Sequence, residues 1–186
     1  MTLSDAQIDR WSRQILLPQV GGRGQQRLLA ARVGMARTGR DHPLAAPVAD
    51  LLARAGVDAA PGRLPPQPDL LIDLAGDAAA DAAVAAHVPL VRGACRGPAA
   101  SVLTLVGRPC ASCAPGEAEP QDGPAGDPLA GAAVAACAAL VAAEALRVLL
   151  ERPRAGRRQR IDLRHGTFVS ESLETSGCER CREARA

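Results

Sequence analysis

The chain of 186 residues contains no lysine, no asparagine and no tyrosine, and it has one phenylalanine and one tryptophan. Without lysine, no ammonium group is available to form a Schiff base, bind a phosphate or act as a catalytic cation. All 22 basic residues are therefore arginines. Because aromatic residues make up 1% of the chain, the core has to be built from alanine, leucine and valine, each of which buries little apolar area.

The length fits one domain with a real core, and a net charge of +2 points to no particular partner. The segment Met1–Gln7 is polar and acidic and has no apolar signal core, so we expect a cytoplasmic protein. The longest apolar run, Leu129–Leu150, has Glu144 and Arg147 one helical turn apart. Such a pair is costly in lipid and natural on a partly exposed helix face, so we expect a core helix and no membrane partner.

Arginines are concentrated between Arg152 and Arg160, which raises the question of nucleic-acid binding. Pro153 and Gly156 interrupt this cluster, no aromatic residues are interleaved, and the chain as a whole is nearly neutral. The pattern therefore favours a solvated turn, and we expect no nucleic-acid partner.

Four of the six cysteines form two CxxC pairs that are separated by 64 residues. The pairs consist of Cys110 with Cys113 and Cys178 with Cys181. Four thiols at this spacing are typical of a tetrahedral structural zinc site, whereas disulfides have little use in a cytosolic chain. The sequence therefore predicts a four-cysteine zinc knuckle. The other two cysteines, Cys95 and Cys137, are interpreted as small core residues rather than nucleophiles.

Helix and strand signals alternate along the chain, which predicts an α/β fold with the zinc knuckle outside the sheet. A capping-box pattern at Ser4 and Gln7 starts the first helix, and Gly21–Gly24 is expected to form a turn. The expected helices are residues 5–16, 25–31, 44–55, 78–87 and 129–150. The expected strands are residues 32–35, 70–72, 90–91, 102–106, 161–163 and 168–173.

The opening segment Arg10–Gln25 closely resembles that of the ThiF/MoeB/HesA family, the bacterial relatives of ubiquitin-activating enzymes. Segment 69–94 resembles the strand, helix and strand after the family's nucleotide site, and the helix 131–150 also matches. The two CxxC pairs match the family's zinc clips. The resemblance implies one domain with three parts: N-terminal docking helices (1–31), a degenerate nucleotide-binding core (32–108) and a zinc-clipped C-terminal part (109–186).

Members of this family use ATP and magnesium to adenylate the C-terminal glycine of a small ubiquitin-like sulfur carrier, and they are usually homodimers. The resemblance therefore implies a shortened Rossmann-like parallel sheet and a homodimer or heterodimer. It also implies a sulfur carrier or a full-length homologue as partner. The matching arginine in the family reaches the phosphates of the partner protomer, which suggests the same role in trans for Arg13.

The chain departs from the family where the nucleotide should bind. Gly34 and Gly39 alone remain in the loop after the first strand, so the GxGxxG spacing that brings backbone close to phosphate is lost. A segment of a few dozen residues is missing after Val57, and the family's asparagine and lysine ligands have no counterpart. The position that corresponds to the family's catalytic aspartate is occupied by Gly76. Asp77, one residue later, is a weak candidate to replace it.

Three functions remain open from the sequence. The best supported is a nucleotide-site-deficient subunit that donates Arg13 to an active homologue or holds a carrier protein. The second is a weak adenylyltransferase with a rebuilt site around Thr38–His42 and Asp77. Of the three functions, this one requires the chain itself to bind ATP and magnesium. The third is a zinc-stabilised scaffold with no link to sulfur transfer.

Overall fold

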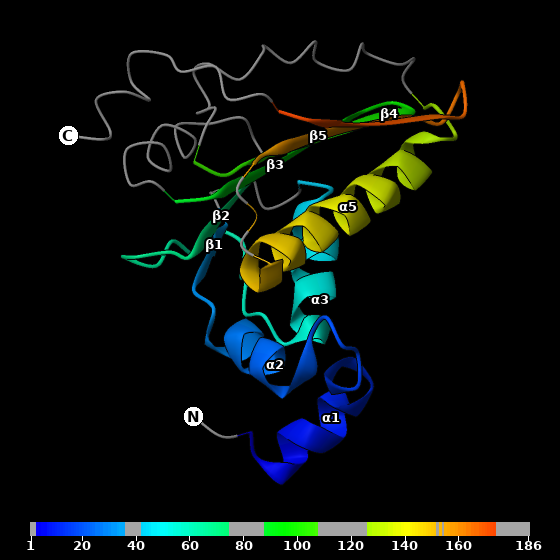
Figure 1. Ribbon diagram of the computed structural model, residues 1–186. Helices are drawn as coiled ribbons and strands as arrows, with labels where there is room; N and C mark the ends of the chain where they lie inside the picture. Colours follow the sequence, from blue (N-terminus) through cyan, green and yellow to red (C-terminus); the bar gives the residue numbers. More distant parts are fainter. Residues whose placement is uncertain are drawn as a thin grey trace, which may run out of the picture.

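The computed structural model describes residues 3–35, 42–74, 88–107, 126–151, 153 and 155–173. Within them, a six-stranded sheet is covered on one face by two helices, while two N-terminal helices lie beyond one end of it (Figure 1). The helices are α1 (Asp5–Ile15), α2 (Gly21–Ala30), α3 (Ala45–Ala55) and α5 (Ala130–Glu151). The strands are β1 (Val33–Met35), β2 (Leu70–Asp73), β3 (Leu90–Arg96), β4 (Ala99–Leu105), β5 (Arg157–Asp162) and β6 (Thr167–Ser172).

The strands lie in the sheet in the order in which they occur in the chain, from β1 to β6. β1, β2 and β3 are parallel, whereas β3 to β6 pair in antiparallel fashion. The expectation of a parallel sheet is therefore right for one half only. Short turns through Gly97 and Gly166, both with positive φ, join β3 to β4 and β5 to β6. Turns this short can connect only antiparallel neighbours.

Of the two N-terminal helices, α1 starts where the sequence predicts, whereas α2 starts earlier than predicted. The capping box is present, since Gln7 N donates to Ser4 Oγ at 3.3 Å and Ser4 N donates to Gln7 Oε1 at 2.9 Å. The predicted turn at Gly21–Gly24 is wrong, because these residues form the first turn of α2. A Cβ at Gly24 would lie 3.1 Å from Leu150 Cδ2, so a glycine there lets α2 lie close against the end of α5.

Side chains of α1 and α2 satisfy the last carbonyl groups of α3. Trp11 Nε1 donates to Arg54 O at 3.1 Å, and the buried Gln25 Nε2 donates to Ala55 O at 2.9 Å. The helix ends at Gly56 with φ +93°, as its sequence predicts. Because unpaired carbonyls at a helix end are costly to bury, these contacts fix the N-terminal helices to the core.

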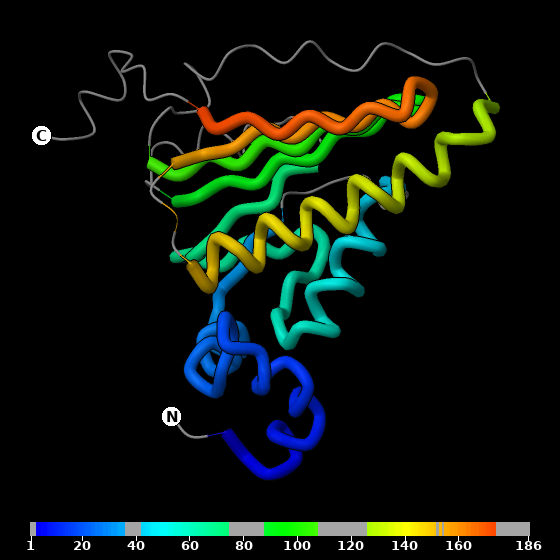
Figure 2. Tube along the Cα trace, turned by 45° about the vertical axis from the view of Figure 1, so that its right-hand side comes forward, coloured from blue at the N-terminus to red at the C-terminus, as the bar shows by residue number. Residues whose placement is uncertain are grey.

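Helix α5 runs along one face of the sheet and forms the centre of the core (Figure 2). Its length and apolar composition would suffice to cross a membrane, yet half of its most apolar stretch is buried inside the protein. The fully buried face consists of Ala133, Cys137, Ala138, Val141 and Ala145. This burial confirms the expected core helix. A smaller apolar cluster on the opposite face of the sheet contains Leu71, Leu90, Leu103, Leu105 and Leu173.

A buried ion network lies between α5 and the antiparallel strands. Glu144 is 2% exposed, which corrects the expectation that it lies on a partly exposed helix face. Its carboxylate accepts hydrogen bonds from Thr104 Oγ1 at 2.8 Å and from Arg147 Nη2 at 2.8 Å. It also pairs with Arg157 of β5. Three donors on three elements compensate for the cost of burying this charge.

The expected arginine-rich turn is in part the strand β5, so this expectation is wrong for Arg157, Arg158 and Arg160. Alternate side chains of a strand point to opposite faces, and Arg157 therefore reaches Glu144 while Arg160 pairs with Glu171 of β6 at 2.8 Å. Arginine stems can cover apolar surface while the charged group is paired, as the guanidinium groups of Arg157 and Arg160 are here.

The stability of the protein is expected to fall in acid because of Glu144. Burial raises the pKa of Glu144, but hydrogen bonds from Arg147, Arg157 and Thr104 outweigh it and hold the pKa below the ordinary value of 4.5. A depressed folded-state pKa stabilises the fold above the unfolded value and loses this contribution as the pH falls through the folded value. Urea unfolding between pH 6 and pH 3 should show this loss below about pH 4.5, with a smaller slope in Glu144→Gln.

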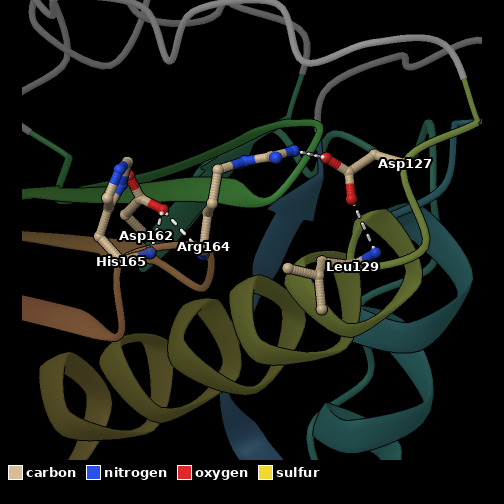
Figure 3. A network of polar contacts seen from close by, with 5 residues as sticks. All are labelled: Asp127, Leu129, Asp162, Arg164 and His165. Atoms are coloured by element: carbon tan, nitrogen blue, oxygen red, sulfur yellow. Dashed lines mark hydrogen bonds and ion pairs between the residues drawn. The ribbon is translucent and has the colours of Figure 1, made fainter.

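The start of α5 is tied to the turn between β5 and β6 by a polar network (Figure 3). Asp127 Oδ1 accepts from Leu129 N at 2.9 Å, and its other oxygen pairs with Arg164. Asp162 Oδ2 lies 2.7 Å from His165 Nδ1, and this hydrogen bond lowers the pKa of Asp162. The network fixes the N-terminus of the core helix to the far hairpin of the sheet.

Candidate functional site

The parallel strands place two charged residues at their carboxyl edge, where open α/β sheets bind ligands. Asp73 ends β2 and is fully buried, and it lies in register with Arg92 of β3. Arg92 Nε donates to Asp73 Oδ2 at 3.0 Å. The partly buried guanidinium therefore balances the charge of a carboxylate that has no access to solvent.

His42 joins this edge from the loop that precedes α3. Its Nδ1 accepts from Leu44 N at 3.4 Å, and the ring also hydrogen-bonds to the backbone of Leu74, the residue after β2. Burial disfavours the charged ring and lowers the pKa of His42, an effect that the Leu74 contact opposes in part. The neutral imidazole thus fixes the start of α3 to the end of β2.

The glycine of the expected phosphate loop has a packing role. Gly34 lies in the middle of β1 and is buried. A Cβ at this position would lie 2.6 Å from Leu71 Cδ2 and 3.1 Å from Leu64 Cδ2. Gly34 therefore allows side chains of β2 and of the loop before β2 to approach the backbone of β1. The resemblance implies that a glycine at this position makes room for a phosphate, whereas here it makes room for Leu71 and Leu64.

Among the described residues, β1 is the edge strand on the parallel side of the sheet. In a doubly wound nucleotide-binding sheet, a second strand lies outside the first, carries the acidic residue that binds the ribose, and creates the point where strand order reverses. Here residues 57–69 lead from α3 to β2 without forming a strand. Met35 N donates to Arg63 O at 2.9 Å, so part of that loop lies beside β1.

Within the described residues the strand order does not reverse, and a loop lies beside β1 on the side where a ribose-binding strand would lie. A cavity of about 480 Å³ lies elsewhere, near the starts of β2 and β3. It is lined by residues that include Arg27, Asp69, Pro89, Val106 and Leu149.

Of the site residues predicted from the sequence, Arg13 is described by the structure, whereas most of the others lie outside the described residues. Arg13 is exposed near the end of α1, and Figure 1 shows α1 beyond α2, on the side from which the chain enters β1. It thus lies away from the carboxyl edge of its own sheet. Asp77, the loop positions 38–41 and the four cysteines of the CxxC pairs lie outside the described residues. Within the described ranges, no three histidine, cysteine or acidic side chains gather as a metal site would require.

The sequence analysis does not identify the ion pair between Asp73 and Arg92. The signal is nevertheless present, because Asp73 ends the apolar segment of β2, Arg92 interrupts the apolar segment of β3, and the two strands are neighbours in the parallel half of the sheet. The network around Glu144 escapes prediction for a different reason. The arginine-rich segment that contains Arg157 predicts a turn, and a turn implies no contact with a core helix.

No protein-family model matches the chain, and no curated protein matches it either. Solved structures do. E. coli MccB with MccA-N7isoASN has a TM-score of 0.68 at 13% identity over 96% of this chain and 75% of MccB. PaaA has a TM-score of 0.67 at 11% identity over 92% of this chain and 75% of PaaA. A heterocyclase in complex with substrate and cofactor has a TM-score of 0.61 at 12% identity, over 96% of this chain and 28% of the heterocyclase.

These likenesses establish the fold. At 11% and 13% identity, the chain shares the α/β fold of PaaA and MccB and spans about three quarters of either protein.

Proposed function

We propose that this chain is a non-catalytic ThiF/MoeB-like subunit that works with a homologue whose nucleotide site is intact. The observation that supports this best is the position of β1 at the edge of the described sheet, with a loop beside it where the ribose-binding strand belongs. Transfer of an adenylyl group depends on preorganised contacts to phosphates and a metal ion. The described carboxyl edge offers instead a closed pair of Asp73 and Arg92.

The partner in this proposal is a small protein or peptide that is activated at its C-terminus, such as a ubiquitin-like sulfur carrier. Among the similar structures, MccB was solved together with MccA-N7isoASN and the heterocyclase together with its substrate. A shared fold supports a shared mode of partner binding even where the nucleotide site is lost. In this proposal a cytoplasmic dimer forms, and a structural zinc held by the four CxxC thiols ties the C-terminal part together.

Arg13 is the residue that would act in trans. It is an exposed residue of α1, the helix that lies beyond α2 in Figure 1, and its planar guanidinium suits phosphate recognition. In this proposal Arg13 does not serve a nucleotide site of its own chain. The chain would instead supply the arginine to the intact site of the homologue.

The test is ATP–pyrophosphate exchange with a carrier protein ending in Gly-Gly. Three reactions are compared: this chain alone, a full-length homologue from the same cell alone, and the two together. We expect background exchange by the chain alone and a stimulation of the homologue of at least tenfold in the mixture, corresponding to about 1.4 kcal/mol of transition-state stabilisation. Arg13→Ala should abolish the stimulation, and Arg23→Ala, which removes an exposed arginine from α2, should retain it.

The other outcomes identify the alternatives. Exchange by this chain alone that is lost in Asp77→Ala would contradict the proposal and establish a rebuilt adenylyltransferase site. No exchange by the chain alone and no stimulation of the homologue, together with no binding of the carrier, would leave a zinc-stabilised scaffold as the function.

A further inference from the structure

Two thiols that the proposed function does not use face each other across the core. Cys95 belongs to β3 and Cys137 to α5. Because side chains alternate along a strand, Cys95 points to the same face as Gly93, the face that α5 covers. On α5, residues 133, 137 and 141 are spaced four apart and therefore form one stripe along β3.

The helix and the strand approach each other closely at this point. A Cβ built on Gly93 would lie 2.5 Å from Val141 Cγ2 and 3.5 Å from Cys137 Sγ. Cys95 Sγ lies 3.7 Å from Ala133 O, and Cys137 Sγ lies 3.6 Å from Ala94 O. Each thiol thus contacts the backbone of the opposite element: Cys95 contacts α5 one helical turn before Cys137, and Cys137 contacts β3 at the residue before Cys95.

The two thiols differ in reactivity and access. The hydrogen bond from Cys137 lowers the pKa of Cys95, although burial opposes this effect, and the same contact together with burial raises the pKa of Cys137. Cys95 is half-buried, whereas Cys137 has no exposed surface. An attacking thiol needs thiolate character and access, while a second thiol that meets it within the protein needs only proximity. Cys95 has the thiolate character and access of an attacking thiol, and Cys137 has the proximity that a second thiol needs.

We propose that Cys95 and Cys137 form a peroxide-reactive thiol pair that closes to a disulfide between β3 and α5. The Cys95 thiolate attacks one oxygen of hydrogen peroxide, the O–O bond breaks, and the leaving hydroxide takes a proton to form water. The sulfur of Cys137 then attacks the sulfenic sulfur of Cys95, the S–O bond breaks, and the Cys137 proton leaves with that hydroxyl as a second water. Two thiols are oxidised by two electrons, and the peroxide is reduced to two waters.

The proposed pair includes neither the ion pair of Asp73 with Arg92 nor any of the CxxC cysteines. The disulfide would close a loop that includes β4 and the start of α5, and it would fix the core helix to the central strand of the sheet. Oxidation should therefore raise the melting temperature, because the cross-link restricts the unfolded chain.

Peptide mapping tests the proposal on the full chain. The protein is treated with one equivalent of hydrogen peroxide, its remaining thiols are alkylated, and it is digested with trypsin and a protease that cleaves before aspartate. These cuts isolate Cys95 in residues 93–96 and Cys137 in residues 127–147, each free of the other four cysteines. We expect a cross-linked pair of these peptides that a reducing agent separates, together with a higher melting temperature of the oxidised protein.

The variants give the controls. Cys137→Ser should leave Cys95 as a sulfenic acid that reacts with dimedone, and Cys95→Ser should give neither that adduct nor the higher melting temperature. The proposal is overturned if wild-type Cys95 is alkylated equally with and without peroxide. It is also overturned if wild-type Cys95 proceeds to the sulfinic acid as readily as it does in Cys137→Ser.

Discussion

Replacing Glu144 by alanine is expected to lower the free energy of unfolding by about 3 kcal/mol. The carboxylate is 2% exposed and accepts hydrogen bonds from Thr104 and Arg147 while it pairs with Arg157. Without it, two guanidinium groups that are 19% and 34% exposed remain next to the core with no counter-charge. Removing one partner of a buried ion pair costs more than the pair itself contributes, and the partial exposure of both arginines keeps the loss at the lower end.

Urea unfolding of the variant against the wild-type protein measures this effect. Glu151→Ala is the matched control, because Glu151 ends the same helix and is exposed, and its replacement should change the stability by less than about 0.5 kcal/mol. Equal losses in the two variants would contradict the stabilising role of the ion network, because alanine is the better helix former and propensity alone would not destabilise either variant.

Gly93→Val is expected to destabilise the fold by about 3 kcal/mol. The new Cβ would lie 2.5 Å from Val141 Cγ2 and 3.4 Å from Leu74 Cδ2. Val141 is fully buried and its branched side chain has little rotamer freedom, so α5 has to move away from β3. Such a shift opens the main interface of the core, and thermal unfolding should show a large drop in melting temperature.

Gly131→Ala provides the contrast. Gly131 lies near the start of α5, its φ is not positive, and a Cβ there meets nothing within 4 Å. This substitution should stabilise the protein by about 0.4–1 kcal/mol, because it restricts the unfolded chain without creating a clash. A stabilising Gly93→Val, or a destabilising Gly131→Ala, would contradict the described approach of α5 to β3.

Much of the fold is predictable because local chemistry and tertiary packing agree. The capping box at Ser4 starts α1, Gly56 ends α3, and the apolar run at Leu70 forms a strand that is parallel on both sides. Each of these signals depends on a few adjacent residues. Helix α5 is predictable for another reason, since its alanine-rich sequence excludes a strand and its charged pair argues against a lipid environment.

The errors occur where distant residues decide the local structure. Gly24, in the first turn of α2, packs against Leu150, which is far away in sequence and accommodates only a residue without a side chain. Arg157 belongs to a strand because Glu144 supplies its counter-charge from a helix that precedes it. Neither partner can be identified from the segment itself, so composition alone favours a turn in both places.

At the candidate site, too, local sequence features are predictable, whereas contacts between distant segments are not. The shortened connection after Val57 is visible in the sequence, and from it the loss of a nucleotide-binding strand can be predicted. The consequence for the sheet, with a loop hydrogen-bonded to β1 through Met35 and Gly34 packed under Leu71, depends on where the remaining chain comes to rest. The pairing of Asp73 with Arg92 likewise requires the register of β2 and β3.

The sequential order of the strands also has a consequence for how the chain reaches its native state. Each strand pairs with the strand that precedes it in the chain, so no later segment has to be inserted between two that are already joined. Contacts between segments that are close in sequence cost less loop entropy and form faster than distant ones. The sheet can therefore grow from β1 towards β6 as synthesis proceeds, with α5 covering β3 and β4 before the last hairpin emerges.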